Sequence, residues 1–368
     1  MATQPSASES PYRPDELEQR LLNEMQRAFP LVARPFAELA ERIGTTEDEV
    51  LSRVERLKTA RIVRQISAIF DSRKLGYRTS LVAMRFEPEA LDEGAGIISL
   101  HPGVSHNYER RHPFNLWFTI AVPPQRELEE EVAALARKAQ PVKTWMLPTI
   151  KLFKIGVNLD ATGQSDITAV EKDEENIGLR SARSWQSDPE IRRLDDDELV
   201  AIRLLQRDLP VVSEPFAALS EGSPINPSRL LALAQGLLAG GQLRRFAAVL
   251  HHRQAGFRAN VMAVWVVPEA RIDEVGGVMA TFKAVSHCYK RPVYPDWPYS
   301  VFTMIHARHK DECEEVVAAI SERTGITDYA LLYSGKEYKK TRVRYFVDDD
   351  QFSVEALPER VVGPASQA

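Results

Sequence analysis

The sequence contains very little cysteine: Cys288 and Cys313 are its two thiols in 368 residues. So few thiols exclude a disulfide framework and a cysteine-rich metal site. No run of about eighteen apolar residues occurs, which argues against a transmembrane helix. The opening segment, MATQPSASESPYRP, lacks the apolar core of a secretion signal. We therefore expect a cytoplasmic protein with no membrane association.

A surplus of positive charge is also missing, because the formal net charge is −5. Nucleic-acid binding requires a positive surface, so this balance argues against a generally basic DNA or RNA binder but leaves a local basic patch open. The hydrophobic content of 44% and charged content of 27% are ordinary for a globular protein. The chain is long enough for two or more domains with separate cores.

What the sequence does contain is an internal duplication with an offset of about 180 residues. Val63–Arg78 reads VRQISAIFDSRKLGYR, and Leu243–Arg258 reads LRRFAAVLHHRQAGFR. The two segments align without a gap and place Gly256 on Gly76. Shared register over this length indicates two copies of one unit.

Each copy opens with three short helical patterns. In the first copy, apolar residues recur at helical spacing in 15–29, 30–44 and 45–62, and Thr45 or Thr46 is the expected N-cap of the third helix. Asp197–Leu209 begins the same pattern in the second copy. Three such helices with a tight break between the second and third predict a winged helix-turn-helix.

Behind each helical unit the pattern changes to strands and helices in the order βαββαβ. The first copy predicts strands over 79–86, 104–111, 116–122 and 142–157, with helices over 89–100 and 126–139. This order is typical of a ferredoxin-like unit, and the second copy repeats it. The predicted fold class is α+β, a tandem duplication of a winged helix-turn-helix plus a ferredoxin-like βαββαβ unit.

The duplication predicts seven segments. They are a disordered tail (1–12), winged helix 1 (13–64), ferredoxin-like domain 1 (65–157), a polar linker (158–190), winged helix 2 (191–244), ferredoxin-like domain 2 (245–348) and a second tail (349–368).

One stretch stands out in both copies. Val104–Ile120 reads VSHNYERRHPFNLWFTI, and Val285–Ile305 reads VSHCYKRPVYPDWPYSVFTMI. Each begins V-S-H-x-Y, continues through arginine and a proline-aromatic turn, and ends in an apolar run with Phe-Thr. Five of the eight histidines lie in or beside these stretches, so we expect the functional site here: His101, His106, His112, His287 and His306.

A helix-turn-helix followed by a ferredoxin-like unit resembles the Lrp/AsnC family, in which the second unit dimerises and binds small effectors. His101–Thr119, HPGVSHNYERRHPFNLWFT, and Val285–Tyr299, VSHCYKRPVYPDWPY, resemble more narrowly the two subunit types of the siroheme decarboxylase family. The chain therefore resembles a fusion of these two subunits, a pseudo-dimer within one chain. Whether the fused chain forms a further homodimer stays open.

The resemblance implies a carboxy-lyase. It would remove CO₂ from the C12 and C18 acetates of siroheme and give 12,18-didecarboxysiroheme in heme d1 or alternative heme biosynthesis. It implies no cofactor beyond the siroheme substrate, which carries its own iron, and no DNA partner. The expected partners are siroheme and other enzymes of tetrapyrrole biosynthesis.

The alternative to the enzyme is a heme- or siroheme-responsive Lrp/AsnC-type transcription regulator. The third helix of each helical unit argues against DNA reading. Between Glu47 and Ala60 it has four acids against three bases, and its first turn is wholly acidic. Acids there would repel DNA phosphates. Ser228–Gly241 has one charged residue, so it offers little for base recognition. A ligand-binding dimer with neither activity is a third interpretation.

The residue types of the repeated stretch suit a carboxylated macrocycle, because guanidinium groups bind carboxylates in bidentate fashion and rings supply flat contacts. The predicted catalytic residues are His106 and His112, supported by Tyr108; either histidine is also a candidate axial contact for the substrate iron. No protein-held metal is predicted. The predicted substrate-binding residues are Arg64, Arg110, Arg111, Trp117, Arg244, Arg245, His287, Tyr289, Arg291, Tyr294 and Trp297.

The two copies also differ. The second copy has no equivalent of His112, and its insert runs through Pro295 and Trp297 instead. We therefore predict two non-equivalent pockets, with catalysis on the His112 side. His306 and His309 are isolated histidines, which are more often structural or solvated than catalytic.

Overall fold

The computed structural model describes residues 12, 14–27, 29–155, 168–170, 191–250, 259–347 and 354–360. The predicted tails and the predicted linker lie largely outside these residues. The chain divides into two compact units, and each is described by itself. The helical unit comprises Met1–Asp71 and Arg193–His251, and the sheet unit comprises Ser72–Arg192 and His252–Ala368.

The helical unit contains both predicted helix-turn-helix copies. The first copy consists of α1 (Glu16–Arg27), α2 (Pro35–Ile43), α3 (Glu47–Thr59) and β1 (Val63–Phe70). The second consists of α7 (Asp196–Leu205), α8 (Pro215–Ser220), α9 (Pro227–Ala239) and β7 (Leu243–Leu250). Gly44 ends α2 in the left-handed region at φ 74°, and the Thr46 side chain accepts a hydrogen bond from the Glu49 amide at the start of α3.

The strands that follow the third helices join the two copies. β1 and β7 pair antiparallel with each other and form a two-stranded sheet. The predicted domain boundaries after residues 64 and 244 fall inside these strands. Since a single strand leaves its backbone groups unpaired, each copy satisfies those of the other.

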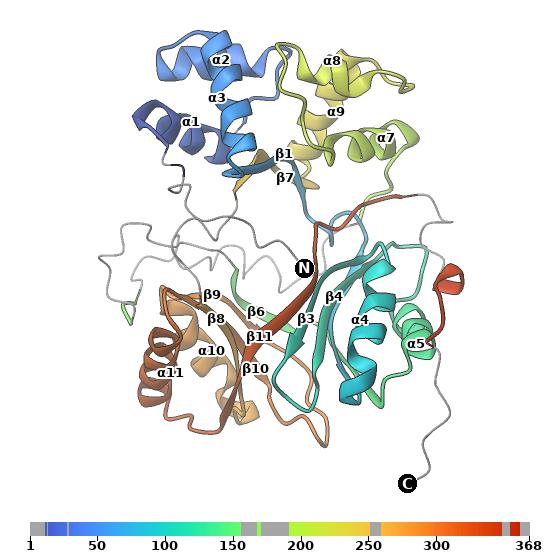
Figure 1. Ribbon diagram of the computed structural model, residues 1–368, viewed down its shortest axis with the longest axis vertical. Helices are drawn as coiled ribbons and strands as arrows, with labels where there is room; N and C mark the ends of the chain where they lie inside the picture. The colour runs from blue at the N-terminus through green and yellow to red at the C-terminus, as the bar shows by residue number, and fades with distance from the viewer. Residues whose placement is uncertain are drawn as a thin grey trace, which may run out of the picture. The chain divides into compact units, whose positions relative to one another are not determined.

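The sheet unit contains both ferredoxin-like copies (Figure 1). The first is β2 (Arg78–Arg85), α4 (Leu91–Leu100), β3 (Val104–Arg110), β4 (Leu116–Val122), α5 (Leu128–Ala139), β5 (Lys143–Leu147) and β6 (Lys151–Ile155). The second is β8 (Ala259–Trp265), α10 (Ile272–Thr281), β9 (Val285–Lys290), β10 (Val301–Ala307), α11 (Lys310–Thr324) and β11 (Tyr329–Lys340). The strand order β5-β2-β4-β3 of the first copy recurs as β11-β8-β10-β9 in the second, which confirms the predicted fold class.

The last strand of each copy crosses into the other copy. β11 pairs with β8 of its own copy over Tyr329–Tyr333, and from Ser334 onward it pairs with β3 of the first copy. β6 of the first copy pairs with β9 of the second. The nine strands therefore form one continuous hydrogen-bonded series, and the red β11 can be followed between the two halves in Figure 1.

The prediction of one long strand over 142–157 is wrong. The chain forms β5 and β6 there, and Pro148 lies between them. Proline has no amide hydrogen to donate to a ladder, so it interrupts a strand. The corresponding β11 has no proline and stays continuous for 12 residues.

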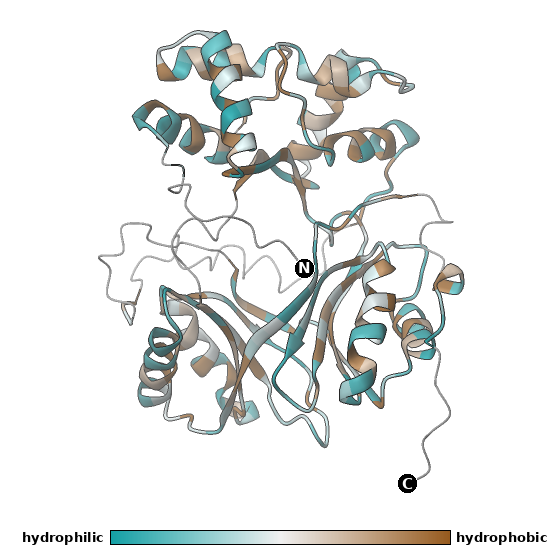
Figure 2. Ribbon diagram, in the orientation of Figure 1, coloured by the Kyte–Doolittle hydropathy of each residue, from teal (hydrophilic) through white to brown (hydrophobic). Residues whose placement is uncertain are grey.

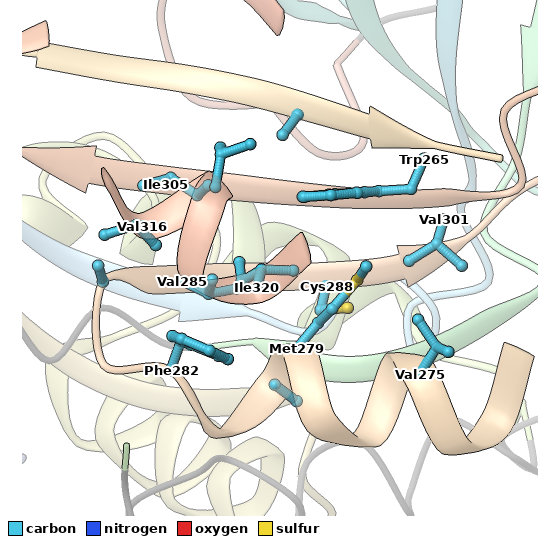
Figure 3. Packing of buried hydrophobic residues seen from close by; sticks show 14 of the residues in the cluster. Trp265, Val275, Met279, Phe282, Val285, Cys288, Val301, Ile305, Val316 and Ile320 are labelled. Atoms are coloured by element: carbon cyan, nitrogen blue, oxygen red, sulfur yellow. The ribbon is translucent and has the colours of Figure 1, made fainter. Parts of the chain in front are cut away.

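Three apolar clusters hold the sheet unit together. One lies beneath α4 and α5, and another lies beneath α10 and α11, where Met279 and Val275 face Cys288 (Figure 3). The third combines both copies and includes Trp117, Trp297 and Phe302. In Figure 2 the helices of this unit show hydrophilic residues on their outer sides, as expected for amphipathic helices on a sheet. Among the described residues, no helix has the length and hydropathy needed to span a membrane.

Because β6 crosses to the second copy, it packs on one of two adjacent glycines of α10, and the two positions should differ in their effect on stability. A Cβ atom at Gly276 would lie 2.5 Å from the ring of Phe153 in β6, whereas one at Gly277 would have no atom within 4 Å. We expect Gly276→Ala to lower the free energy of unfolding by about 1–3 kcal/mol, because overpacking displaces the ring. Gly277→Ala should raise it by about 0.5–1 kcal/mol through helix propensity. Urea unfolding of both variants checks this, and equal effects would contradict the packing of β6 on α10.

Candidate functional site

The repeated motif places three chemically active side chains on one face of a strand. In β3, His106, Tyr108 and Arg110 alternate with residues of the opposite face. One of those residues, Asn107, donates a hydrogen bond from Nδ2 to the Ala95 carbonyl of α4 at 3.0 Å. The sequence S-H-x-Y-x-R therefore keeps the neutral residue against the helix and directs the His, Tyr and Arg series to the other face.

The second copy has the same arrangement. His287, Tyr289 and Arg291 share one face in and after β9, and Cys288 faces α10, with its thiol 3.7 Å from the Gly276 carbonyl oxygen. The ring planes of histidine and tyrosine are close to parallel in both copies, at 28° with centroids 6.2 Å apart in the first and 23° with centroids 5.9 Å apart in the second.

Both faces line the same cavity, which has a volume of about 840 Å³. The prediction of two separate pockets is therefore wrong, because the crossing strands bring the two motifs to one site. We call the two sets the first half-site (His106, Tyr108, Arg110) and the second half-site (His287, Tyr289, Arg291). The predicted residues that line the cavity are His106, Tyr108, Arg110, Arg111, Trp117, His287, Tyr289 and Arg291.

A serine orients the histidine of each half-site. The Ser105 hydroxyl lies 3.0 Å from Nδ1 of His106, and the Ser286 hydroxyl lies 2.8 Å from Nδ1 of His287. A hydroxyl that holds one ring nitrogen fixes the plane of the imidazole. Burial, with the positive charges of His306 and Arg291 nearby, lowers the pKa of His287 to about 4. The second half-site therefore holds a neutral imidazole at neutral pH.

The two half-site arginines reach across to the opposite copy. Arg110 donates from Nη1 to the Leu332 carbonyl at 2.9 Å and to the Ser334 hydroxyl at 2.7 Å. Arg291 donates from Nη1 to the Leu147 carbonyl. Leu332 lies in β11 of the second copy, and Leu147 lies in β5, which has the corresponding place beside β2 in the first copy. Each arginine is thus held by the strand that closes the other copy's sheet.

Both guanidinium groups are buried cations that have no carboxylate partner in the part of the chain that the structure describes. Arg110 is 5% exposed and Arg291 is 9% exposed, and desolvation lowers the pKa of each to about 10, so both remain charged at neutral pH. Among the described residues, Nε of neither group has a hydrogen-bond partner. A buried donor left unpaired is costly, and a carboxylate oxygen supplies both the missing acceptor and the missing charge.

The rest of the cavity wall is also cationic and aromatic. Arg111, Lys310 and Lys340 add positive charge, and Glu337 is the one carboxylate among the lining residues. Lys310 lies 3.4 Å from a Glu314 carboxylate oxygen. The flat surfaces come from both copies: Tyr108, Trp117, Phe118, Tyr289, Phe302 and Tyr333. This wall suits a broad ligand with several carboxylates.

Sequence reasoning missed part of this wall. His306 lines the cavity, although we expected a structural or solvated residue. Its alternation with Met304 and Phe302 on β10 was a signal that could have found it. Tyr333 and Lys340 could not have been found this way, because the crossing of β11 brings that strand to the site, and Lys310 lies at the start of α11, outside the repeated motif.

His112, Tyr294 and Trp297 are not among the lining residues. His112 accepts a hydrogen bond at Nδ1 from the Phe114 amide at 3.0 Å, and its ring packs edge-on against Trp297 at 5.2 Å. Burial lowers the pKa of His112. Tyr294 stacks on Trp145 at 3.9 Å. These ring contacts join the two copies. The geometry does not support His112 as the leading proton donor.

The remaining predicted residues belong to the helical unit. Arg64 lies in β1, and Arg244 and Arg245 lie in β7. Arg244 forms an ion pair with Asp71 at 2.8 Å. Their role in substrate binding stays a prediction.

Comparison with known proteins identifies the family. The model of the AsnC-like ligand binding domain matches residues 74–154 and 254–339, and the model of the siroheme decarboxylase NirDL-like HTH domain matches residues 18–64. A siroheme decarboxylase of Hydrogenobacter thermophilus is 38% identical over 331 residues, which cover 90% of this chain and 95% of the relative. The chain belongs to the siroheme decarboxylase family.

Other siroheme decarboxylases clarify the duplication. The alpha and beta subunits of the Desulfovibrio desulfuricans enzyme match 39% and 41% of this chain at 40% and 38% identity, covering 83% and 95% of their own lengths. Each subunit of that enzyme thus matches about two fifths of this chain, which contains two copies of the AsnC-like ligand binding domain. A crystal structure of the siroheme decarboxylase NirDL superposes with a TM-score of 0.71 at 34% identity, covering 92% of this chain and 96% of that one. A second crystal structure, with a TM-score of 0.71, is titled as a co-complex with an iron-uroporphyrin III analogue.

The low pKa of His287 predicts a pH dependence of stability. The folded protein keeps this ring neutral down to a pKa of about 4, whereas the unfolded chain binds a proton near the ordinary value of 6.5. The stabilisation is therefore complete above about pH 6.5 and is lost as the pH falls towards 4, by at most about 1.4 kcal/mol per unit. Cavity water should reduce this slope.

We expect His287→Gln to flatten the fall in unfolding free energy between pH 6.5 and 4.5, as measured by urea titration at fixed pH. His309→Gln is the matched control, because His309 is exposed at the start of α11. A wild-type slope in His287→Gln would contradict the assignment of a buried neutral imidazole.

Proposed function

We propose that this enzyme is a carboxy-lyase that removes CO₂ from the C12 and C18 acetates of siroheme and gives 12,18-didecarboxysiroheme. One observation carries the proposal: two buried arginines, whose Nε atoms have no hydrogen-bond partner among the described residues, face a single cavity beside oriented histidines. The family relationship supports the same substrate. The reaction would serve the synthesis of heme d1 or of heme by the alternative route.

The cavity residues fit the steps of such a reaction. Arg110 and Arg291 would hold carboxylates by charge-assisted hydrogen bonds, and the tyrosine, tryptophan and phenylalanine rings would pack on the macrocycle. When the bond between the methylene carbon and the carboxylate breaks, its electron pair stays on the methylene carbon and delocalises into the ring system. A proton then completes the methyl group, and positioning and a placed acid both lower the barrier.

His106 and His287 are the proposed proton donors, with Tyr108 and Tyr289 beside them. The pKa of His287 is about 4 in the protein alone, and the carboxylates of bound siroheme would raise it, because a nearby anion favours the protonated imidazole. The iron enters with the substrate. Of the motif histidines, His106 and His287 line the cavity, and either is a proposed contact for that iron. Among the described residues, no group of three or more His, Cys, Asp or Glu side chains is arranged to hold a metal ion.

The helical unit is proposed to act as a scaffold rather than as a DNA reader. All three bases of α3 are engaged within the unit: Arg53, Arg56 and Lys58 lie 2.6, 2.9 and 2.8 Å from carboxylate oxygens. The acids Glu47, Asp48 and Glu49 occupy the first turn of α3, where a recognition helix meets base edges.

The scaffold interpretation predicts no sequence-specific binding of promoter DNA. Electrophoretic mobility shifts between 50 and 200 mM salt, with and without siroheme, measure it; phosphate contacts would show as a steep fall in affinity over about that range. A specific, salt-sensitive complex would favour a tetrapyrrole-responsive regulator instead.

The proposed activity predicts the loss of two CO₂ from siroheme during anaerobic incubation with the purified chain. Mass spectrometry of the extracted pigment measures the product. Arg110→Met and Arg291→Met should each weaken siroheme binding about tenfold or more, since a hydrogen bond to a charged group contributes about 1.5–3 kcal/mol. Methionine is a flexible side chain that fills irregular gaps in a core.

Arg323→Met is the matched control, because Arg323 is exposed on α11 of the same unit. An unchanged pigment with wild-type protein would contradict the proposed activity. Wild-type affinity in both arginine variants would contradict the assignment of the carboxylate contacts.

A further inference from the structure

The cavity is built from two half-sites that are related by exchange of the copies. Arg110 is held by the Leu332 carbonyl of the second copy, and Arg291 is held by the Leu147 carbonyl of the first. The serine-histidine pairs and the histidine-tyrosine stacks repeat in the same way. Such reciprocity is the mark of an isologous interface with approximate twofold symmetry.

Siroheme has a matching symmetry in the part that reacts. Its C12 and C18 acetates lie on neighbouring pyrrole rings, at equivalent positions on either side of the meso carbon that joins those rings. A half-turn about the line through that meso carbon exchanges the two acetates, just as exchange of the copies relates the half-sites. One macrocycle in the shared cavity can therefore present one acetate to each half-site.

On the basis of the function proposed above, we propose that each half-site removes CO₂ from a different one of the two siroheme acetates. The first half-site (His106, Tyr108, Arg110) acts on one acetate, and the second (His287, Tyr289, Arg291) acts on the other, without the pigment turning over between steps. In each step the bond from the methylene carbon to the carboxylate breaks, CO₂ leaves, and one proton from the half-site replaces it. No electrons are gained or lost overall.

The half-sites also differ, so the two steps should differ in rate. Lys310 and His306 of the second copy line the cavity, and the charge of His306 acts on His287. The first copy has Ala121 in β4 at the position that corresponds to His306 in β10. The electrostatic surroundings of the two proposed donors are therefore unequal.

Anaerobic turnover by His106→Ala and His287→Ala tests the proposal. Each variant should stop after the loss of one CO₂, with the second loss slowed at least about 100-fold, the lower range for a placed acid. The two mono-decarboxylated pigments should be different isomers. Each isolated intermediate should be completed by the other variant and not by the variant that produced it.

Bound-pigment absorption and urea unfolding verify that each variant is folded and occupied, and His106→Gln and His287→Gln provide a second pair. His309→Ala is the control for an exposed histidine outside the cavity. Any other pattern overturns the proposal, including one variant that completes both steps while the other completes neither, or two identical intermediates. Failure of the wild type to release any CO₂ would instead contradict the proposed function itself.

Discussion

The strand exchange between the two ferredoxin-like copies is the constraint on which the rest of the sheet unit depends. A strand end that leaves its own sheet has unpaired backbone groups, and these must be satisfied elsewhere. β11 satisfies them on β3, and β6 does so on β9. This pairing fixes the two copies against each other, and it turns two copies of a strand motif into one cavity.

The same exchange explains how two arginines can be buried with no carboxylate partner among the residues that the structure describes. A lone buried charge is expensive, and each guanidinium is partly compensated by a carbonyl oxygen of the other copy and by a tyrosine ring. Compensation is incomplete, since Nε of each arginine lacks a partner among the described residues. Under the proposed function, these two groups would receive anionic oxygens of the ligand, and the pairing of their free Nε–H donors would contribute to the free energy of binding.

The sequence was sufficient to predict the local placement of the motif side chains and the internal duplication. Alternation in S-H-x-Y-x-R predicts which side chains share a face, and the repeat predicts that every element has a counterpart. It could not show that the counterparts meet, because that depends on strand pairing between copies. For this reason His112 looked like the distinguishing acid, although its ring packs on Trp297 and outside the cavity wall. His306 was missed although its alternation with Phe302 and Met304 was a usable signal, whereas Lys310 and Lys340 lie on α11 and β11, outside the repeated motif.

The central claim is that one macrocycle occupies one cavity and spans both half-sites. An anaerobic crystal structure of the chain with siroheme tests it most directly. The account predicts one siroheme per chain, with the C12 and C18 acetates on opposite sides of the cavity, one beside Arg110 and the other beside Arg291. Both acetates beside a single arginine, or two pigments per chain, would contradict it.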